Sequence, residues 1–145
     1  IGQEDNKFQG LDFVIMMAIS KVSLPNKFRK DLKKAKRKEL SEIWQGDDYS
    51  SIGEVVRFAP SACNTQPWIV KADKKQLTVY RYQQPGKRGI MAADKVSYYN
   101  RIDTGIFLLF LEVCLNKEKI DFEKNLYHDD GESREKTKIA EYQLK

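Results

Sequence analysis

The chain has 145 residues, of which 41% are hydrophobic and 32% charged, and its formal net charge is +5. This length suits one domain with a hydrophobic core, and no apolar stretch reaches the roughly 18 residues that a membrane-spanning helix needs. The composition therefore excludes a membrane-spanning or disordered chain and predicts one cytoplasmic globular domain over residues 1–145.

The first predicted element is a buried strand over residues 11–19, a run rich in apolar and β-branched side chains. A helix is expected to start at Pro25 and to run through the basic residues 27–38, because proline suits the first helical turn, and charged residues continue to Glu42. Residues 27–38 contain eight Lys or Arg and one Asp. They suit either a solvated helix face or a surface for polyanions, although no aromatic ladder accompanies them.

The middle of the chain predicts a short helix. Residues 45–51 are polar and turn-forming, and Ser50 or Ser51 is expected to cap the helix that follows. Its apolar stripe consists of Ile52, Val55, Val56 and Ala59. Pro60 disfavours helical geometry at the preceding residue and so helps to end the helix.

The next predicted element is a hairpin. Residues 67–72 and 76–82 are β-prone runs joined by Asp73, Lys74 and Lys75. Residues 83–89 then form a loop rich in proline and glycine.

A long helix is expected from Asp94 or Ser97. Its apolar residues repeat at helical spacing, and others lie on the opposite side, so the helix should be buried nearly all round, as a central element or a subunit interface. Gly105 inside it suggests that another backbone passes close, since glycine costs about 1 kcal/mol relative to alanine there. The apolar residues of the first set are Ile102, Ile106, Leu109, Phe110 and Val113, and those of the second are Leu108 and Leu111.

The tail predicts two strands, over residues 120–127 and 139–144, that could pair with the hairpin. The elements together predict an α+β fold in which an antiparallel or mixed sheet packs with helices.

The cysteines and the single histidine offer little chemistry. Cys63 and Cys114 lie 51 positions apart and form no Cys-x-x-Cys pair, so we expect two buried thiols in a reducing compartment. His128 lies in a predicted turn beside two aspartates, and nothing places it near a nucleophile. We expect a surface histidine, no catalytic acid, base or nucleophile, and no metal site.

The most unusual segment is the helix-to-strand turn that presents Ser61, Asn64, Thr65 and Gln66. Side-chain amides and hydroxyls at such a turn can hydrogen-bond to the edge of a flat heteroaromatic ring. They can equally bond to local backbone in a purely structural turn. The residues by themselves favour neither interpretation.

The sequence of residues 59–68, APSACNTQPW, closely resembles the A-P-S-x-x-N-x-Q-P-W segment of nitroreductase-family flavoproteins. Arg37-Lys38 with Leu40 and Ile43, and the later run 103–106, are similar to the branch of that family whose motif lies late in the chain. The resemblance spans roughly residues 13 to 144.

The resemblance implies a nitroreductase-like fold with FMN bound between two α+β halves. Hydride would pass from NAD(P)H through the flavin to a nitroaromatic or quinone-like acceptor. Carried over residue by residue, it places Pro60, Ser61, Ala62, Asn64 and Gln66 against the flavin. Trp68 would anchor the following strand in the core, and a homodimer or a missing N-terminal half would complete the site.

One departure matters. Members of the family normally open with an R-R-S-x-R segment whose cations hold the FMN phosphate, and this chain has none. The basic residues 27–38 lack the serine, so we assign no phosphate contact to them. We therefore expect the C-terminal portion of a longer nitroreductase-like chain. The alternatives are a polyanion-binding module that uses the basic helix 27–38, with nucleic acid disfavoured, and a relic of the fold without cofactor.

Overall fold

The structure is a computed structural model, and it describes Lys21 and residues 35–82, 89–129 and 136–145. Apart from Lys21, all of these residues belong to one compact unit, residues 31–145. The strand predicted over residues 11–19, most of the predicted basic helix and the loop 83–88 lie outside the described residues.

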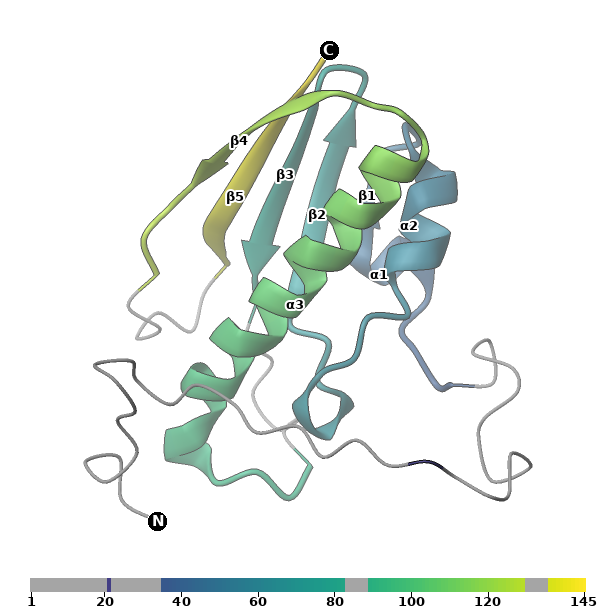
Figure 1. Ribbon diagram of the computed structural model, residues 1–145. Coiled ribbons are helices and arrows are strands. Elements are labelled where there is room, and N and C mark those ends of the chain that lie inside the picture. The colour runs from purple at the N-terminus through teal and green to yellow at the C-terminus, as the bar shows by residue number, and fades with distance from the viewer. Residues whose placement is uncertain (1–20, 22–34, 83–88, 130–135) are drawn as a thin grey trace. The chain divides into compact units, whose positions relative to one another are not determined.

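Five strands of the described chain form one mixed sheet in the order β1-β2-β3-β5-β4 (Figure 1). β1 pairs with β2 in parallel, and every other neighbouring pair is antiparallel. The predicted α+β class with a mixed sheet is confirmed. The strands are β1 (Trp44–Gln45), β2 (Trp68–Asp73), β3 (Gln76–Arg81), β4 (Phe122–Leu126) and β5 (Thr137–Leu144).

β2 and β3 form the predicted hairpin. Its turn is stabilised because the Lys75 N–H donates to Asp73 Oδ1 at 2.9 Å, a local contact that aspartate makes readily. The two predicted C-terminal strands are also confirmed, and β5 pairs with β3 as expected. The short strand β1 was missed, since the polar residues that follow Trp44 predicted only a turn.

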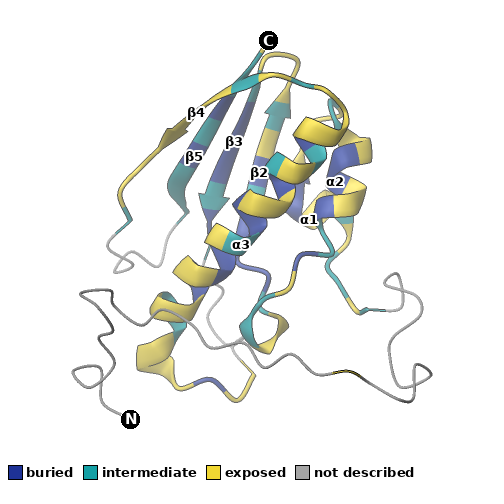
Figure 2. Cartoon of the chain, viewed as in Figure 1, coloured by how far each residue is buried: buried dark blue, intermediate teal, exposed yellow. Residues whose placement is uncertain are grey.

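The helices of the described chain pack on one face of this sheet (Figure 1). Inward-facing residues of the strands, such as Val70, Leu77 and Tyr142, form one core with residues of α3 (Figure 2). The α-helices are α1 (Leu40–Ile43), α2 (Ser50–Val56) and α3 (Val96–Lys117), and the 3₁₀ turns are η4 (Ala62–Asn64) and η5 (Ala93–Lys95).

The prediction of a helix through the basic residues is wrong for residues 36–38, because α1 begins only at Leu40. The backbone of this segment is bound by side chains from a distant loop. The Lys38 N–H donates to Gln66 Oε1 at 2.8 Å, and the Lys36 carbonyl accepts from Asn64 Nδ2 at 3.1 Å. These backbone groups therefore do not form helical hydrogen bonds.

The predicted helix α2 is confirmed, but its cap is wrong. The N-cap residue is Tyr49 in the left-handed region, and Ser50 is already helical. Val55 is exposed, whereas Gly53 is buried, so the buried stripe is rotated from the predicted one. The reason is packing, because a Cβ at Gly53 would lie only 3.0 Å from the Trp44 ring.

The long helix α3 is confirmed, but it is not buried all round within the described chain. Its outward side is exposed along much of its length (Figure 2). The buried face starts with Asn100, Asp103 and Thr104, whose polar groups are hydrogen-bonded, so counting apolar residues selected the wrong face. No described segment makes the expected close backbone approach to Gly105, since none of the described atoms lies within 4 Å of a Cβ added there.

No helix among the described residues is long and apolar enough to cross a membrane.

Candidate functional site

The predicted site residues lie on the loop 59–67 between α2 and β2, which we call the motif loop. After Pro60 it makes the 3₁₀ turn η4, in which Cys63 and Asn64 adopt positive φ values of 49° and 55°, and Gln66 after the turn has a φ of 48°. This conformation is uncommon for residues other than glycine and is most easily tolerated by asparagine. The loop therefore needs contacts that hold it in place.

Ser61 supplies the first of these contacts within the loop. Its carbonyl accepts from the Asn64 N–H at 3.0 Å, and its hydroxyl oxygen accepts from the Gln66 N–H at 3.0 Å. The side chain of Ser61 thus closes the turn, which is the local role that the structural interpretation of this segment assigned to it.

Helix α3 holds the loop from one side. The Ala62 N–H donates to Asp103 Oδ1 at 2.8 Å, and the Thr65 hydroxyl lies 3.3 Å from Asn100 Oδ1 and 3.4 Å from Asp103 Oδ2. Burial raises the pKa of the Asp103 carboxyl, and the hydrogen bonds from Ala62 and Thr65 oppose that rise. The Asp103 carboxyl thus holds the motif loop through both of its oxygens. The sequence pointed to this position only through the resemblance of the run 103–106 to the nitroreductase family.

The segment before α1 holds the loop from another side. Arg37 Nη1 donates to Asn64 Oδ1 at 2.8 Å, and Lys38 Nζ donates to the Gln66 carbonyl at 2.9 Å. Gln66 is only 3% exposed, and its amide is bound to Lys38 and Asn64. These described residues of the basic segment therefore serve the motif loop, and they are not a solvated helix face.

Four of the five predicted residues are at least partly exposed in the structure, and we call this exposed part of the motif loop, formed by Pro60, Ser61, Ala62 and Asn64, the ridge. Pro60 and Asn64 are exposed, and Ser61 and Ala62 are partly exposed, while Gln66 lies beneath them in the interior. Such a ridge presents backbone groups and short uncharged side chains. It can contact the face or edge of a flat ring, whereas the buried Gln66 acts by fixing the shape of the loop.

Trp68 anchors the following strand in the core, as predicted. Its side chain is 1% exposed and stacks on Phe107 of α3, with ring centroids 4.7 Å apart. Its Nε1 has no hydrogen-bond partner among the described residues, so packing alone holds the ring.

The cysteine prediction is half right. Both thiols are free, but Cys63 is exposed on the motif loop and Cys114 is only partly buried. Cys63 faces outward because the left-handed turn places it on the ridge beside Asn64. His128 is exposed, as expected.

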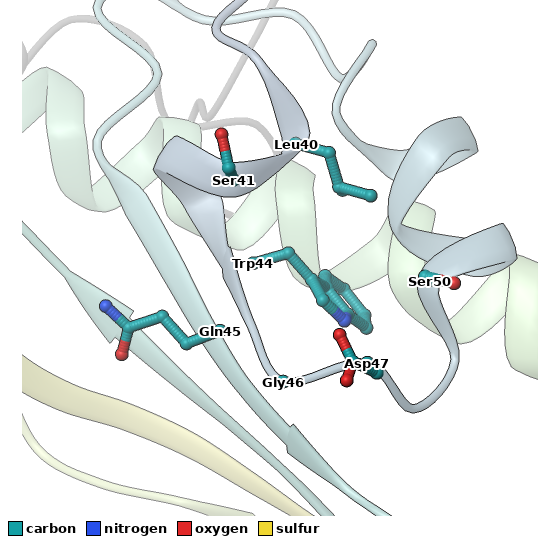
Figure 3. A pocket seen from close by; sticks show the side chains of 7 residues that line it. All are labelled: Leu40, Ser41, Trp44, Gln45, Gly46, Asp47 and Ser50. Atoms are coloured by element: carbon teal, nitrogen blue, oxygen red, sulfur yellow. The ribbon is translucent and has the colours of Figure 1, made fainter.

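A cavity of about 500 Å³ lies elsewhere, near β1 and the start of α2 (Figure 3). Trp44, Gln45 and Asp47 are among the residues that line it (Figure 3). No motif-loop residue lines it. Its remaining lining residues are Leu40, Ser41, Gly46 and Ser50.

Comparison with known proteins agrees with the motif. Residues 3–114, more than three quarters of the chain, match the family model described as "Putative TM nitroreductase". The match includes the motif loop and most of α3. No significant match was found among curated proteins or among solved structures.

Proposed function

Because this chain belongs to the nitroreductase family whose model it matches, we propose that it is an FMN-dependent oxidoreductase. Family membership itself supports an oxidoreductase of nitroreductase type. The proposal adds that the electrons come from NAD(P)H and pass to a nitroaromatic or quinone-like acceptor. When bound, FMN supplies the hydride chemistry.

The observation that carries the proposal is the shape of the motif loop. In this proposal Pro60, Ser61, Ala62 and Asn64 contact the flavin through the exposed ridge, and Gln66 supports it from below. Asp103 holds Ala62 from one side and Arg37 holds Asn64 from the other. A loop fixed in this way binds a flat ring without first losing conformational freedom.

The charges around the motif loop also suit a bound flavin. The Arg37 guanidinium lies beside the ridge, where a cation favours a bound ring that gains negative charge on reduction. The described residues that contact the loop contribute no catalytic acid or base to the proposal, since Asp103 is hydrogen-bonded and buried beneath it.

We also propose that a second copy of the chain supplies the opposite wall of the site by packing along α3. The outward stripe of this helix is uncharged, and it includes Leu109 and Val113, which are 60% and 58% exposed. Other exposed apolar side chains of this helix are Tyr98, Ile102 and Phe110.

The first experiment is an FMN titration of the full chain, followed by visible absorption and flavin fluorescence. The test variant is Asn64→Gly, which keeps the positive φ possible but removes the hydrogen bonds to Arg37 and Lys36. We expect the wild type to bind FMN saturably and to oxidise NAD(P)H when a nitroaromatic acceptor is present. The variant should bind FMN about tenfold more weakly, because a charge-assisted hydrogen bond holds the loop.

The matched control is Asn125→Ala, at an exposed position of β4 that belongs neither to the motif loop nor to α3. It should bind FMN like the wild type. A wild-type protein that stays colourless at saturating FMN, or an Asn64→Gly variant with unchanged affinity, would contradict the proposal.

A further inference from the structure

A second cavity lies between α3 and the segment that follows β4, and its volume is about 250 Å³. None of the predicted site residues lines it, so it is separate from the motif loop. Its lining residues are Arg101, Thr104, Tyr127, His128, Asp129 and Ile139.

The acid in this cavity is already neutralised. Asp129 forms a two-pronged ion pair with Arg81, in which Arg81 Nη2 donates to Asp129 Oδ1 at 2.8 Å. Both side chains are buried, at 0% and 8% exposure. The Asp129 carboxylate therefore belongs to the wall of the cavity and does not repel an incoming anion.

Among the described residues around the cavity, the remaining charges leave one positive group in excess. Lys138, which lies over the Tyr127 ring, forms an ion pair with Glu141 at 3.2 Å. Arg101 makes only one contact among the described residues, a long 3.5 Å hydrogen bond to the Asp129 carbonyl. No carboxylate of the described chain pairs with Arg101, so its guanidinium can bind an anion.

The volume, the lining and the charge of this cavity limit the kind of ligand that it can bind. Guanidinium binds carboxylate in a planar, two-pronged geometry, and a single cation suits a monoanion better than a phosphate dianion. Tyr127 and Ile139 supply apolar wall. The volume is below the roughly 300 to 1,000 Å³ of pockets that hold drug-sized ligands, so the ligand is small.

We propose that this cavity binds a small aromatic carboxylate, with the carboxylate on Arg101 and the ring against Tyr127 and Ile139. The inference does not depend on flavin binding, because it uses none of the motif-loop residues. It assigns a second ligand site to the chain.

The test uses benzoate as the probe and its neutral isostere benzamide as the chemical control, with binding to the full chain measured by isothermal titration calorimetry. Benzoate should bind saturably, and benzamide should bind at least about tenfold more weakly, because only the carboxylate forms charge-assisted hydrogen bonds. Arg101→Gln should lose about tenfold or more in benzoate affinity. Lys117→Gln removes an equal charge from the other end of α3 and should bind benzoate like the wild type.

A second variant keeps the test valid if Arg101→Gln unfolds. Tyr127→Ala retains the guanidinium but removes the aromatic wall at a partly exposed position, and it should weaken benzoate binding about threefold or more. Wild-type protein that does not bind benzoate, or that binds benzamide equally well, would overturn the proposal. Equal losses in Arg101→Gln and Lys117→Gln would overturn it too, since they would indicate general charge attraction.

Discussion

At the scale of single residues, Asp103 connects the motif loop to α3, and its ionisation should affect stability. Burial raises the pKa of this carboxyl above its ordinary value of 3.8. A group whose pKa is raised by folding contributes stability that is fully present below pH 3.8 and is lost as the pH rises through the folded-state pKa. The neutral form of Asp103 is therefore the one that favours folding.

Asp103→Asn should remove this pH dependence while its amide oxygen still accepts from the Ala62 N–H. We expect the free energy of unfolding of the variant, relative to the wild type, to increase from about pH 4 upward and then to level off. Each unit of raised pKa corresponds to about 1.4 kcal/mol. Urea unfolding of both proteins across pH 3.5 to 7.5 measures the difference. A difference that falls with rising pH would show that the hydrogen bonds outweigh burial.

The residues of the candidate site could be predicted only in part. The motif placed Pro60, Ser61, Ala62 and Asn64 on one loop, and the structure leaves them at least partly exposed. Their supports were not visible as a local pattern. Arg37 lies 27 positions before Asn64, so only the fold shows that the two side chains meet.

At the scale of the elements, two helical glycines have opposite surroundings. A Cβ at Gly53 would lie 2.8 Å from Leu40 Cδ1 and 3.0 Å from the Trp44 ring, whereas one at Gly105 would meet nothing within 4 Å. Alanine gains about 1 kcal/mol of helix propensity over glycine at either position. The space available for the methyl group therefore decides whether a Gly→Ala substitution raises or lowers the free energy of unfolding.

We expect Gly105→Ala to raise the free energy of unfolding by about 0.5 to 1 kcal/mol, and Gly53→Ala to lower it by about 1 to 2 kcal/mol. The two variants control for each other in urea unfolding, since each changes a glycine inside a helix. Equal effects in the two helices would mean that the Trp44 ring can shift to make room for the methyl group without lowering the free energy of unfolding.

The same helices show why elements are easier to predict than their orientations. Apolar spacing predicted α3 and the hairpin, but Ile102 and Leu109 lie outside while Asn100 and Asp103 lie inside. Periodicity counts apolar side chains and ignores buried polar groups that have partners. The orientation of α3 thus depends on the motif loop, which is far away in the sequence.

At the scale of the whole molecule, the exposed stripe of α3 predicts self-association. Leu109→Gln should prevent it, because a polar amide in the middle of an apolar interface loses its hydrogen bonds to water. Leu126→Gln is the matched control, since Leu126 is similarly exposed, at 63%, but lies on β4. Sedimentation velocity over a concentration series should give dimers for the wild type and the control, and single chains for Leu109→Gln.

A wild type that remains a single chain at high concentration would contradict dimerisation through α3. The flavin proposal would still be testable by the FMN titration, so the two results are distinguishable. The apolar residues of this stripe were visible in the sequence, but their exposure in the described chain was not predicted, and a subunit interface on α3 stays a prediction.

β1 and β4, the outer strands of the sheet within the described residues, have a consequence for how copies of the chain can meet. β1 has only two residues, and β4 carries Glu123 and Lys124, which are in ion pairs with Lys145 and Glu112. Short or charged edge strands resist the addition of strands from other molecules. These edges therefore disfavour open-ended growth through the sheet, as in amyloid, whereas the proposed dimer through α3 would be a closed pair if its two helices crossed at a two-fold axis.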